Sequence, residues 1–465
     1  MSRMREPENT APRRKQKGMG MARFTKEDIF RMVKEEDVEF IRLQFCDIFG
    51  MPKNLAVTAS QLEKALNNEC SFDATAIEGF RDTLQEMYLY PDLDTFDIFP
   101  WRPQTGKVAR MYCDIYTEEG MPFGGDSRQV LRRVLKEAEQ MGCFFEVQPE
   151  LEFFLFHTDD YGRPTTTTHE SAGCYDVAPS DLAENVRRDI ILTLENMGCE
   201  ILGSHHEISP AQHEIDFGGG RADKAADQVI TFRQAVRTVA KKHGLYATFM
   251  PKPRADMNGS GMHLRIQCRD RLGRNLFSDE NGEGRLSGLG RAFTAGLLEH
   301  AAGMTLITNP LVNSYKRLVS GFDAPTAICW SDVLANRQAF IHVSGKNADS
   351  TRIELRSPDC VCNPYLAFAV CIAAGLDGIK RNLNPPELIR ENLTEKTDEQ
   401  ISALSLRKLP ETLGEALEAC ENDPMIRETL GEKILNGYRN SKKKEWEAFR
   451  KVVTNWEIEN FLEKY

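Results

Sequence analysis

The chain has 465 residues, of which 41% are hydrophobic and 25 are phenylalanine, so it is long enough for two unequal domains with sizeable cores. Its formal net charge of −11 argues against nucleic-acid binding, and its longest near-apolar stretch is shorter than the roughly 20 residues that a membrane helix needs. Twelve cysteines without a CxxC pair or a secretory signal indicate reduced thiols and a cytoplasmic location.

The first part of the chain is predicted to be a basic tail followed by a small α+β unit. Residues 1–21 are polar and rich in Lys and Arg without an apolar segment, which predicts a disordered tail rather than a signal peptide. Apolar spacing predicts a helix from Thr25 to Lys34, and alternation predicts a strand from Val38 to Phe49. The other elements expected before residue 122 are a helix at Ser60–Asn67 and strands at Asp97–Phe99 and Val108–Tyr116.

Turn residues between Met121 and Asp126 predict a domain boundary, after which helices and strands alternate. Asp126 or Ser127 can cap the first helix of this second part. The helices expected here are Gln129–Met141, Asp181–Met197 and Asp223–His243. The strands expected here are Phe144–Phe156, Glu200–Ile208 and Ala247–Pro251. The charged segment from Pro410 to Tyr465 is predicted to be helical, with interruptions at Gly414 and Gly431.

Two glutamates stand out on the strand predicted at Phe144–Phe156. Because side chains of a strand alternate between its faces, Glu150 and Glu152 share one face, and Leu151 and Phe153 share the other. Two neighbouring carboxylates repel each other unless a positive charge lies between them. A lone pair of this kind is typical of a solvated strand face, so it indicates a metal site only together with other candidate ligands.

Other segments supply such candidates. A histidine follows a Gly-rich turn in Asn258-Gly259-Ser260-Gly261-Met262-His263, and Arg352-Ile353-Glu354-Leu355-Arg356 places two arginines beside a glutamate. The candidate ligands are five carboxylates and one imidazole: Glu150, Glu152, Glu207, Glu214, Glu354 and His263. Such a set suits Mg²⁺ or Mn²⁺ rather than structural zinc. Arginines suit phosphate oxygens or a substrate carboxylate, although surface ion pairs would explain Arg352 and Arg356 as well. Metal with arginine is typical of phosphoryl transfer.

The order of these motifs resembles that of type I glutamine synthetases over residues 22–465. The segments that carry the resemblance are FIRLQFCDIFG, MYLYPDLDTFDIFPWRP, HHEISPAQHEIDF, TFMPKPRADMNGSGMH, NPLVNSYKRLVSGFDAP, RIELRSPD and CNPYLAFA. The resemblance implies an α+β fold, with a small β-grasp-like domain over residues 22–122 and a catalytic α/β domain over residues 123–465 whose sheet forms half a funnel. It also implies a homo-oligomer, a dodecamer whose active sites are shared between subunits.

The resemblance also implies a role for particular residues. One metal site is Glu152, Glu207 and Glu214, and the other is Glu150, His263 and Glu354, so that each active site holds two or more Mg²⁺ or Mn²⁺ ions. Glutamate is held by Asn258, Gly259, Arg317 and Arg356, and the phosphates of ATP face Arg337 and Arg352. Asp73 reaches the neighbouring subunit's site and helps to deprotonate ammonium, and Asp323 lies on a flap over the intermediate. Asn392-Leu393-Thr394 replaces the adenylylation motif NLY, which places the chain in the non-adenylylated subgroup.

The implied reaction is the ATP-dependent ligation of ammonia to glutamate through γ-glutamyl phosphate, which gives glutamine. Several positions depart from the family pattern. The usual flap glutamate is Asp323, and the positions that resemble nucleotide contacts are altered at Leu202, Arg265, Gln267 and His342. The shorter acid at Asp323 favours, as an alternative, a γ-glutamyl-amine ligase that accepts a polyamine or another amine. The altered nucleotide positions favour a second alternative, a catalytically weak regulator that binds glutamate or glutamine.

Overall fold

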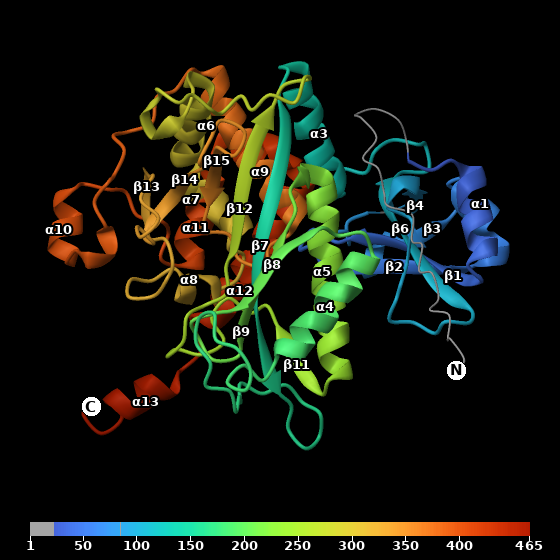
Figure 1. Cartoon of the computed structure of the whole chain (residues 1–465), viewed down its shortest axis with the longest axis horizontal. Coiled ribbons are helices and arrows are strands. Elements are labelled where there is room, and N and C mark those ends of the chain that lie inside the picture. Colours follow the sequence, from blue (N-terminus) through green and yellow to red (C-terminus); the bar gives the residue numbers. More distant parts are fainter. Residues whose placement is uncertain (1–22, 84) are drawn as a thin grey trace, which may run out of the picture.

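Two β-sheets organise the chain, a small one near the N-terminus and a large one in the rest of the chain (Figure 1). This computed structural model describes residues 23–83 and 85–465. The tail predicted over residues 1–21 therefore lies outside the described residues. In the part of the chain that is described, no helix combines the length and the apolar character needed to cross a membrane.

The small sheet has the order β2-β1-β6-β4-β3, with β5 paired to β6, and only β1 and β6 run parallel among its neighbours. Its strands are β1 (Val38–Cys46), β2 (Pro52–Thr58), β3 (Ser71–Asp73), β4 (Glu86–Pro91), β5 (Asp97–Ile98) and β6 (Lys107–Tyr116). Helices α1 (Lys26–Glu35) and α2 (Leu62–Leu66) belong to the same unit. The Thr25 side chain caps α1. The first strand ends earlier than predicted, because the Asp47 carboxylate accepts hydrogen bonds from Phe49 N and Met51 N and closes a turn.

The large sheet has the order β13-β14-β15-β12-β7-β9-β8, with β10 and β11 also paired to β7. Its strands are β7 (Phe144–His157), β8 (Ile201–His206), β9 (Gln212–Phe217), β10 (Gly220–Arg221), β11 (Leu245–Thr248), β12 (Met262–Arg269), β13 (Ala327–Ser331), β14 (Ala339–Ser344) and β15 (Arg352–Leu355). The long strand β7 is central, and β12 and β9 flank it in antiparallel pairing. This arrangement brings four strands that carry predicted ligands into one continuous surface.

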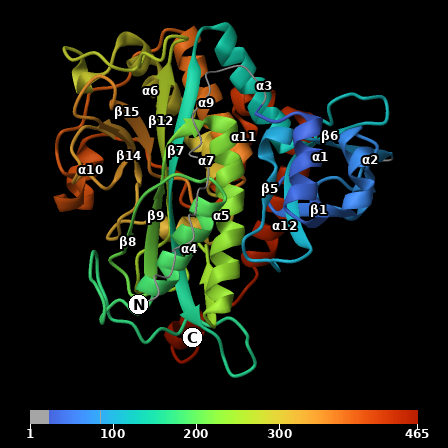
Figure 2. The same cartoon turned by 45° about the vertical axis from the view of Figure 1, so that its right-hand side comes forward.

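Helices cover the apolar face of this sheet. Phe145, Val147, Leu151 and Phe153 of β7 point to that face and are fully or almost fully buried in the main core. The helices in this part of the chain, not all of which contact the sheet, are α3 (Ser127–Gln140), α4 (Glu184–Asn196), α5 (Ala222–Lys242), α6 (Gly288–Glu299), α7 (Ala301–Thr308), α8 (Ser314–Arg317), α9 (Pro364–Lys380), α10 (Asp398–Ala403), α11 (Leu413–Glu421), α12 (Pro424–Phe449) and α13 (Asn455–Phe461). Helix α5 runs alongside β7 (Figure 2). The opposite face of β7, which carries Glu150 and Glu152, is left for the site.

Buried ion pairs join the small sheet to the helices of the large one. Arg128 of α3 contacts Asp92 and Asp114 from the small unit and Asp227 from α5, at 2.7 to 2.9 Å. The Tyr112 hydroxyl of β6 also donates a hydrogen bond to the Asp227 carbonyl oxygen. A buried cation shared by three carboxylates ties the two sheets together.

Candidate active site

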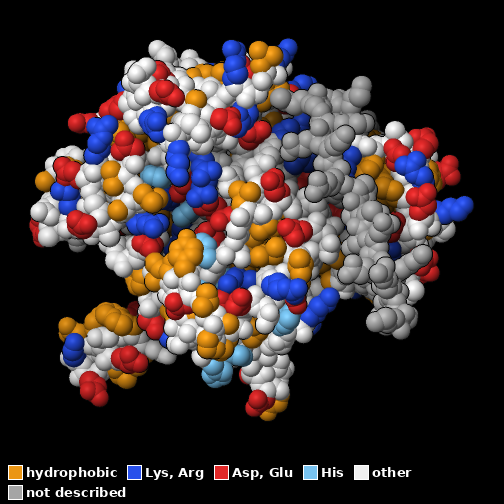
Figure 3. Space-filling view, in the orientation of Figure 1, with side chains coloured by type: hydrophobic (Ala, Val, Ile, Leu, Met, Phe, Trp, Pro, Cys, Tyr) orange, Lys and Arg blue, Asp and Glu red, His pale blue; other side chains and the backbone are white. Residues whose placement is uncertain are grey.

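A polar cavity of about 280 Å³ opens on the face of the large sheet that the helices leave free. Acidic, basic and histidine side chains gather in a hollow at the centre of this face (Figure 3). The lining residues are Glu150, Glu152, Cys174, Tyr175, His205, Glu207, Ile208, Gln212, Glu214, Asn258, Gly259, His263, Arg265, Asp323, Pro325, Leu334, Arg337, Glu354 and Arg356. Most of the residues predicted from the sequence therefore meet in one place.

Three carboxylates form the first predicted metal set. Glu152 of β7 pairs with Glu214 of β9 across the sheet, and Glu207 follows the end of β8. One oxygen from each of the three lies within 4.8 Å of the others. Burial and the neighbouring charge of Glu207 raise the pKa of Glu152 to about 7, and burial together with Glu152 raises the pKa of Glu214. A divalent cation at their centre would relieve this repulsion, so the three residues fit a metal site.

Neighbouring groups orient these carboxylates. The Glu152 Oε2 atom accepts hydrogen bonds from Gly261 N at 2.8 Å and from Gln212 Nε2 at 3.2 Å. His205 Nε2 lies 2.9 Å from Glu207 Oε1, and the Tyr175 ring stacks on His205 with centroids 4.4 Å apart. Burial opposes ionisation of Glu207, but the hydrogen bond from His205 lowers its pKa below the ordinary value.

Several of these supporting residues were not predicted from the sequence. Gln212 lies two residues before Glu214 on β9, so the two side chains face the same side of the sheet. This spacing is the feature of the sequence that could have placed Gln212 in the cavity. Tyr175 and Cys174 lie in a loop far along the chain from the ligands, and no local pattern marks them. His205 belongs to the same group, because its ring contacts Glu207.

The second predicted metal set has a different geometry. Glu150, His263 and Glu354 lie on β7, β12 and β15, and His263 Nδ1 is 3.6 Å from Glu150 Oε2 and 3.7 Å from Glu354 Oε1. Arg265 is also present, with Nε 3.2 Å from Glu354 Oε2 and Nη1 in an ion pair with Glu150 Oε1. A guanidinium thus already bridges the two carboxylates at the place where the second metal is predicted.

The residues predicted to bind glutamate divide into two groups. Asn258, Gly259 and Arg356 line the cavity, and Arg356 Nε lies 2.8 Å from Glu354 Oε1. Arg317 does not line it, and its contact with glutamate stays a prediction. Its Nη1 atom donates to the Ser357 carbonyl oxygen at 2.8 Å, and its Nη2 atom donates to the Arg356 carbonyl oxygen at 3.0 Å. Arg317 therefore supports the backbone behind the binding residues.

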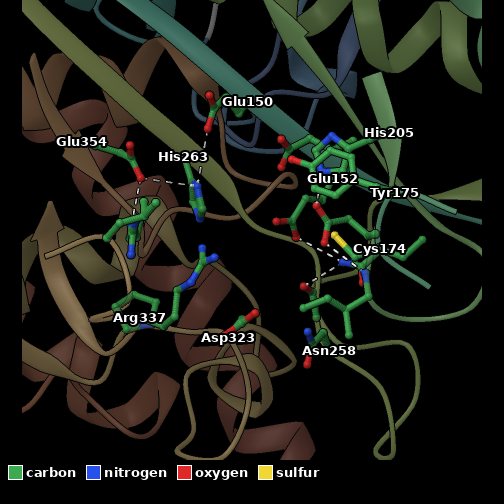
Figure 4. Close-up of a pocket in the computed structure, with 18 of the residues that line it drawn as sticks. Glu150, Glu152, Cys174, Tyr175, His205, Asn258, His263, Asp323, Arg337 and Glu354 are labelled. Atoms are coloured by element: carbon green, nitrogen blue, oxygen red, sulfur yellow. Dashed lines mark hydrogen bonds and ion pairs between the residues drawn. The ribbon is translucent and has the colours of Figure 1, made fainter. Parts of the chain in front are cut away.

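Asp323 and Arg337 lie across the cavity from the glutamates, with their side chains toward the space (Figure 4). Both are exposed, as expected for groups that close over a substrate. Arg352 lies outside the lining and donates to Gln148 Oε1 at 3.0 Å. Asp73 also lies outside it, at the edge of the small sheet, where its carboxylate accepts a hydrogen bond from Thr75 N at 2.8 Å.

Three of the four altered nucleotide positions lie outside the lining. Leu202 is 57% exposed, and Gln267 donates hydrogen bonds to the Asp349 and Thr351 carbonyl oxygens. His342 is buried on β14, with Nδ1 3.8 Å from Glu354 Oε2. Only Arg265 of this group reaches the cavity. Of the four departures, only that at Arg265 therefore changes the lining of this cavity.

The fold and this cavity define a class of protein: a metal-dependent enzyme that handles anionic, phosphate-bearing substrates. Comparison with protein families makes the assignment specific. The family model described as "Glutamine synthetase, catalytic domain" matches residues 124–461, and the family model described as "Glutamine synthetase, beta-Grasp domain" matches residues 37–118. The chain belongs to the glutamine synthetase family. The predicted α+β fold, with a β-grasp unit before a catalytic domain, is confirmed.

Individual relatives agree with this assignment. A glutamine synthetase of Clostridium saccharobutylicum is 49% identical over 447 residues, which cover 96% of this chain and 100% of that protein. One from Staphylococcus aureus strain N315 is 49% identical over 444 residues, covering 95% and 99%. Among solved structures, a GmaS/ADP complex has a TM-score of 0.84 at 30% identity, covering 94% of this chain and 99% of that one.

Proposed function

We propose that this chain is a glutamine synthetase, which ligates ammonia to the γ-carboxylate of glutamate and forms glutamine, ADP and phosphate. The observation that carries the proposal is the convergence of Glu152, Glu207 and Glu214 in one cavity with Arg337 and Arg356. Relatives that are 49% identical over nearly the whole chain and bear the same name support it.

In this proposal, the carboxylates of Glu152, Glu207 and Glu214 hold a divalent cation, Mg²⁺ or Mn²⁺. When bound, that cation neutralises charge on the phosphate oxygens of ATP as the γ-phosphoryl group is transferred. Asn258 and Gly259 orient glutamate from the loop before β12, and Arg356 contacts its carboxylate through a planar donor fork.

Arg337 and Asp323 act on the opposite side of the cavity. Arg337 contacts phosphate oxygens as negative charge moves onto them, and Asp323 approaches the ammonium. Ammonium gives its proton to a carboxylate, Asp73 of a neighbouring subunit, and the resulting ammonia attacks the acyl phosphate and displaces phosphate. Closure of these exposed residues over the substrate would exclude water, which otherwise hydrolyses γ-glutamyl phosphate. Arg352 lies further along the β15 face and positions Gln148 rather than a substrate oxygen.

The wider organisation belongs to the same proposal. The domains are residues 22–122 and 123–465, and the protein acts in the cytoplasm, in keeping with twelve free thiols. It assembles as a homo-oligomer, a dodecamer, in which Asp73 completes the active site of a neighbouring subunit. An exposed carboxylate at the edge of the small sheet, outside the cavity of its own chain, supports this role for Asp73.

The test is phosphate release and glutamine formation from ATP and glutamate, with ammonium and with a panel of small amines. We expect release that depends on ammonium and falls by at least about 10²-fold in Glu152→Gln, since a metal ligand is lost. Glu146→Gln is the matched control, because Glu146 lies on the same strand but outside the cavity, paired with Arg269. Release with an amine but not with ammonium would instead assign a γ-glutamyl-amine ligase. No release with any nucleophile would overturn both.

A further inference from the structure

Arg265 sits where the sequence predicts ligands for a second metal. Its position follows from strand register, since Arg265 of β12 pairs with Glu354 of β15 on one side and with Gln148 of β7 on the other. His263 precedes it by two residues and therefore faces the same side of the sheet. The Arg265 side chain thus projects from the middle strand into the space between Glu150 and Glu354.

The two carboxylate sets differ in how their charge is balanced. Among the described residues, no Lys or Arg nitrogen lies within ion-pair distance of Glu152, Glu207 or Glu214. In the other set, Glu150 pairs with Arg265, and Glu354 pairs with both Arg265 and Arg356. Two negative charges there already face two guanidinium groups.

Burial makes this difference decisive. The side chains of Glu150 and Glu354 are each 4% exposed, and a buried carboxylate needs a counter-charge. A divalent cation bound among Glu150, His263 and Glu354 would have to displace Arg265 or lie beside a positive charge. The first set presents the opposite situation, three carboxylates with no paired Lys or Arg and with His205 as the neighbour of Glu207, so an added divalent cation finds no fixed guanidinium there.

We propose that Arg265 acts as a fixed cation in place of a second metal, so that this chain holds a single divalent cation, at Glu152, Glu207 and Glu214. For the identity of the substrate, this inference rests on the proposed function. In that reaction, the Arg265 guanidinium faces the transferred phosphoryl group. Its planar donor fork suits phosphate oxygens, and it is always charged. Arg265 is thereby a further catalytic residue of the site.

The test counts Mn²⁺ bound to the nucleotide-free protein by equilibrium dialysis, with free Mn²⁺ measured by electron paramagnetic resonance. We expect one tight Mn²⁺ per chain in the wild type and none in Glu207→Gln. Arg265→Ala should gain a second Mn²⁺, because Glu150 and Glu354 lose their shared counter-charge. Arg265→Lys keeps a cation and should stay at one, as should the control Gln267→Ala, which alters the next residue on the same face of β12.

Two results would overturn the proposal: two tight Mn²⁺ per chain in the wild type, or no gain in a folded Arg265→Ala. A further variant keeps the test decisive if Arg265→Ala does not fold. Glu150→Gln should leave the wild-type count unchanged, and a lower count would show that Glu150 ligates a metal in the presence of Arg265. The experiment measures metal binding and not glutamine formation. A protein that forms no glutamine can therefore still confirm or contradict the proposal for Arg265, and the two proposals are tested independently.

Discussion

Gly259 shows how a single hydrogen atom in place of a side chain shapes the substrate loop. A Cβ atom at this position would lie 2.2 Å from the Pro251 carbonyl oxygen and 2.9 Å from Arg317 Cγ. Neither neighbour yields easily, because Pro251 O is backbone and Arg317 is held by hydrogen bonds to two carbonyl oxygens. The loop must therefore shift if Gly259 gains a side chain, and it carries Asn258 with it.

We predict that Gly259→Ala raises the KM for glutamate by more than about tenfold, while overpacking lowers the free energy of unfolding by about 1–3 kcal/mol. Steady-state kinetics and thermal unfolding measure the two effects. Gly220→Ala is the control, because no atom lies within 4 Å of its added Cβ. An unchanged KM for glutamate in Gly259→Ala would contradict the placement of this loop against the substrate.

The sequence predicts which face these residues occupy better than it predicts what they touch. Alternation along one strand is local, so it correctly places Glu150 and Glu152 on one face of β7. The partners of Arg265 depend on the register between β12 and its two neighbours, and that register is set by packing of residues distant in the sequence. For the same reason, the hydrogen bonds of Arg317 to the backbone could not be predicted.

At the scale of elements, His300 joins four helices. It ends α6 and precedes α7, and its ring lies between Asp377 of α9 and Asp423, which caps α12. Nδ1 is 2.8 Å from Asp423 Oδ2, and Nε2 is 3.0 Å from Asp377 Oδ2, which also pairs with Arg381. Burial alone would lower the pKa of His300, but the two carboxylates raise it above the ordinary value.

The sign of the resulting pH dependence follows from this shift. A group whose pKa is raised in the folded state stabilises the fold fully below its unfolded pKa of about 6.5, and this contribution is lost as pH rises through the folded pKa. We predict that His300→Gln lowers Tm more at pH ~5.5 than at pH ~9, with a cost of about 1.5–3 kcal/mol at the lower pH. Thermal unfolding across this pH range measures the effect.

His243→Gln is the matched control for this prediction. His243 pairs with a single aspartate, and its Nε2 atom lies 2.9 Å from Asp189 Oδ2, but both side chains are partly exposed. Surface pairs contribute about 0–1 kcal/mol, so its Tm difference should be small at every pH. A His300→Gln difference that stays constant from low to high pH would refute a role for the charged imidazole.

Long amphipathic elements were predicted well, and short or edge elements were not. Helices α3 and α5 lie where the periodicity places them, since each buries a continuous apolar stripe. Strand β2 was missed, because it alternates only between exposed and half-buried positions and buries nothing fully. Gly431 interrupts α12 as predicted, with a φ of 73°. Gly414 was wrongly predicted to interrupt a helix; it lies inside α11, where an added Cβ would meet the Trp446 ring at 2.8 Å.

At the scale of the whole molecule, the position of Asp73 makes the assembly testable. It is exposed on β3, at the edge of the small sheet, which lies to one side of the large sheet in Figure 1. The cavity of the same chain lies on the face of the large sheet. Head-to-tail contacts between identical subunits close into rings, and they bring one edge of a subunit against a different surface of the next. In the proposed assembly, each site takes Asp73 from one subunit and Glu207 from its neighbour.

Hybrid assemblies separate a shared site from a self-contained one. We predict that Asp73→Asn and Glu207→Gln are each inactive when assembled alone. When the two variants are co-expressed, each with a different tag, and purified through both tags, the hybrid assemblies should show about a quarter of wild-type activity at random mixing. That fraction arises because half of the sites receive an intact Asp73, and half of those retain an intact Glu207. If Asp73 acted in its own chain, every chain would carry one defect and the hybrids would stay inactive. A hybrid with Glu146→Gln in place of Glu207→Gln controls for mixing, since that partner is active by itself.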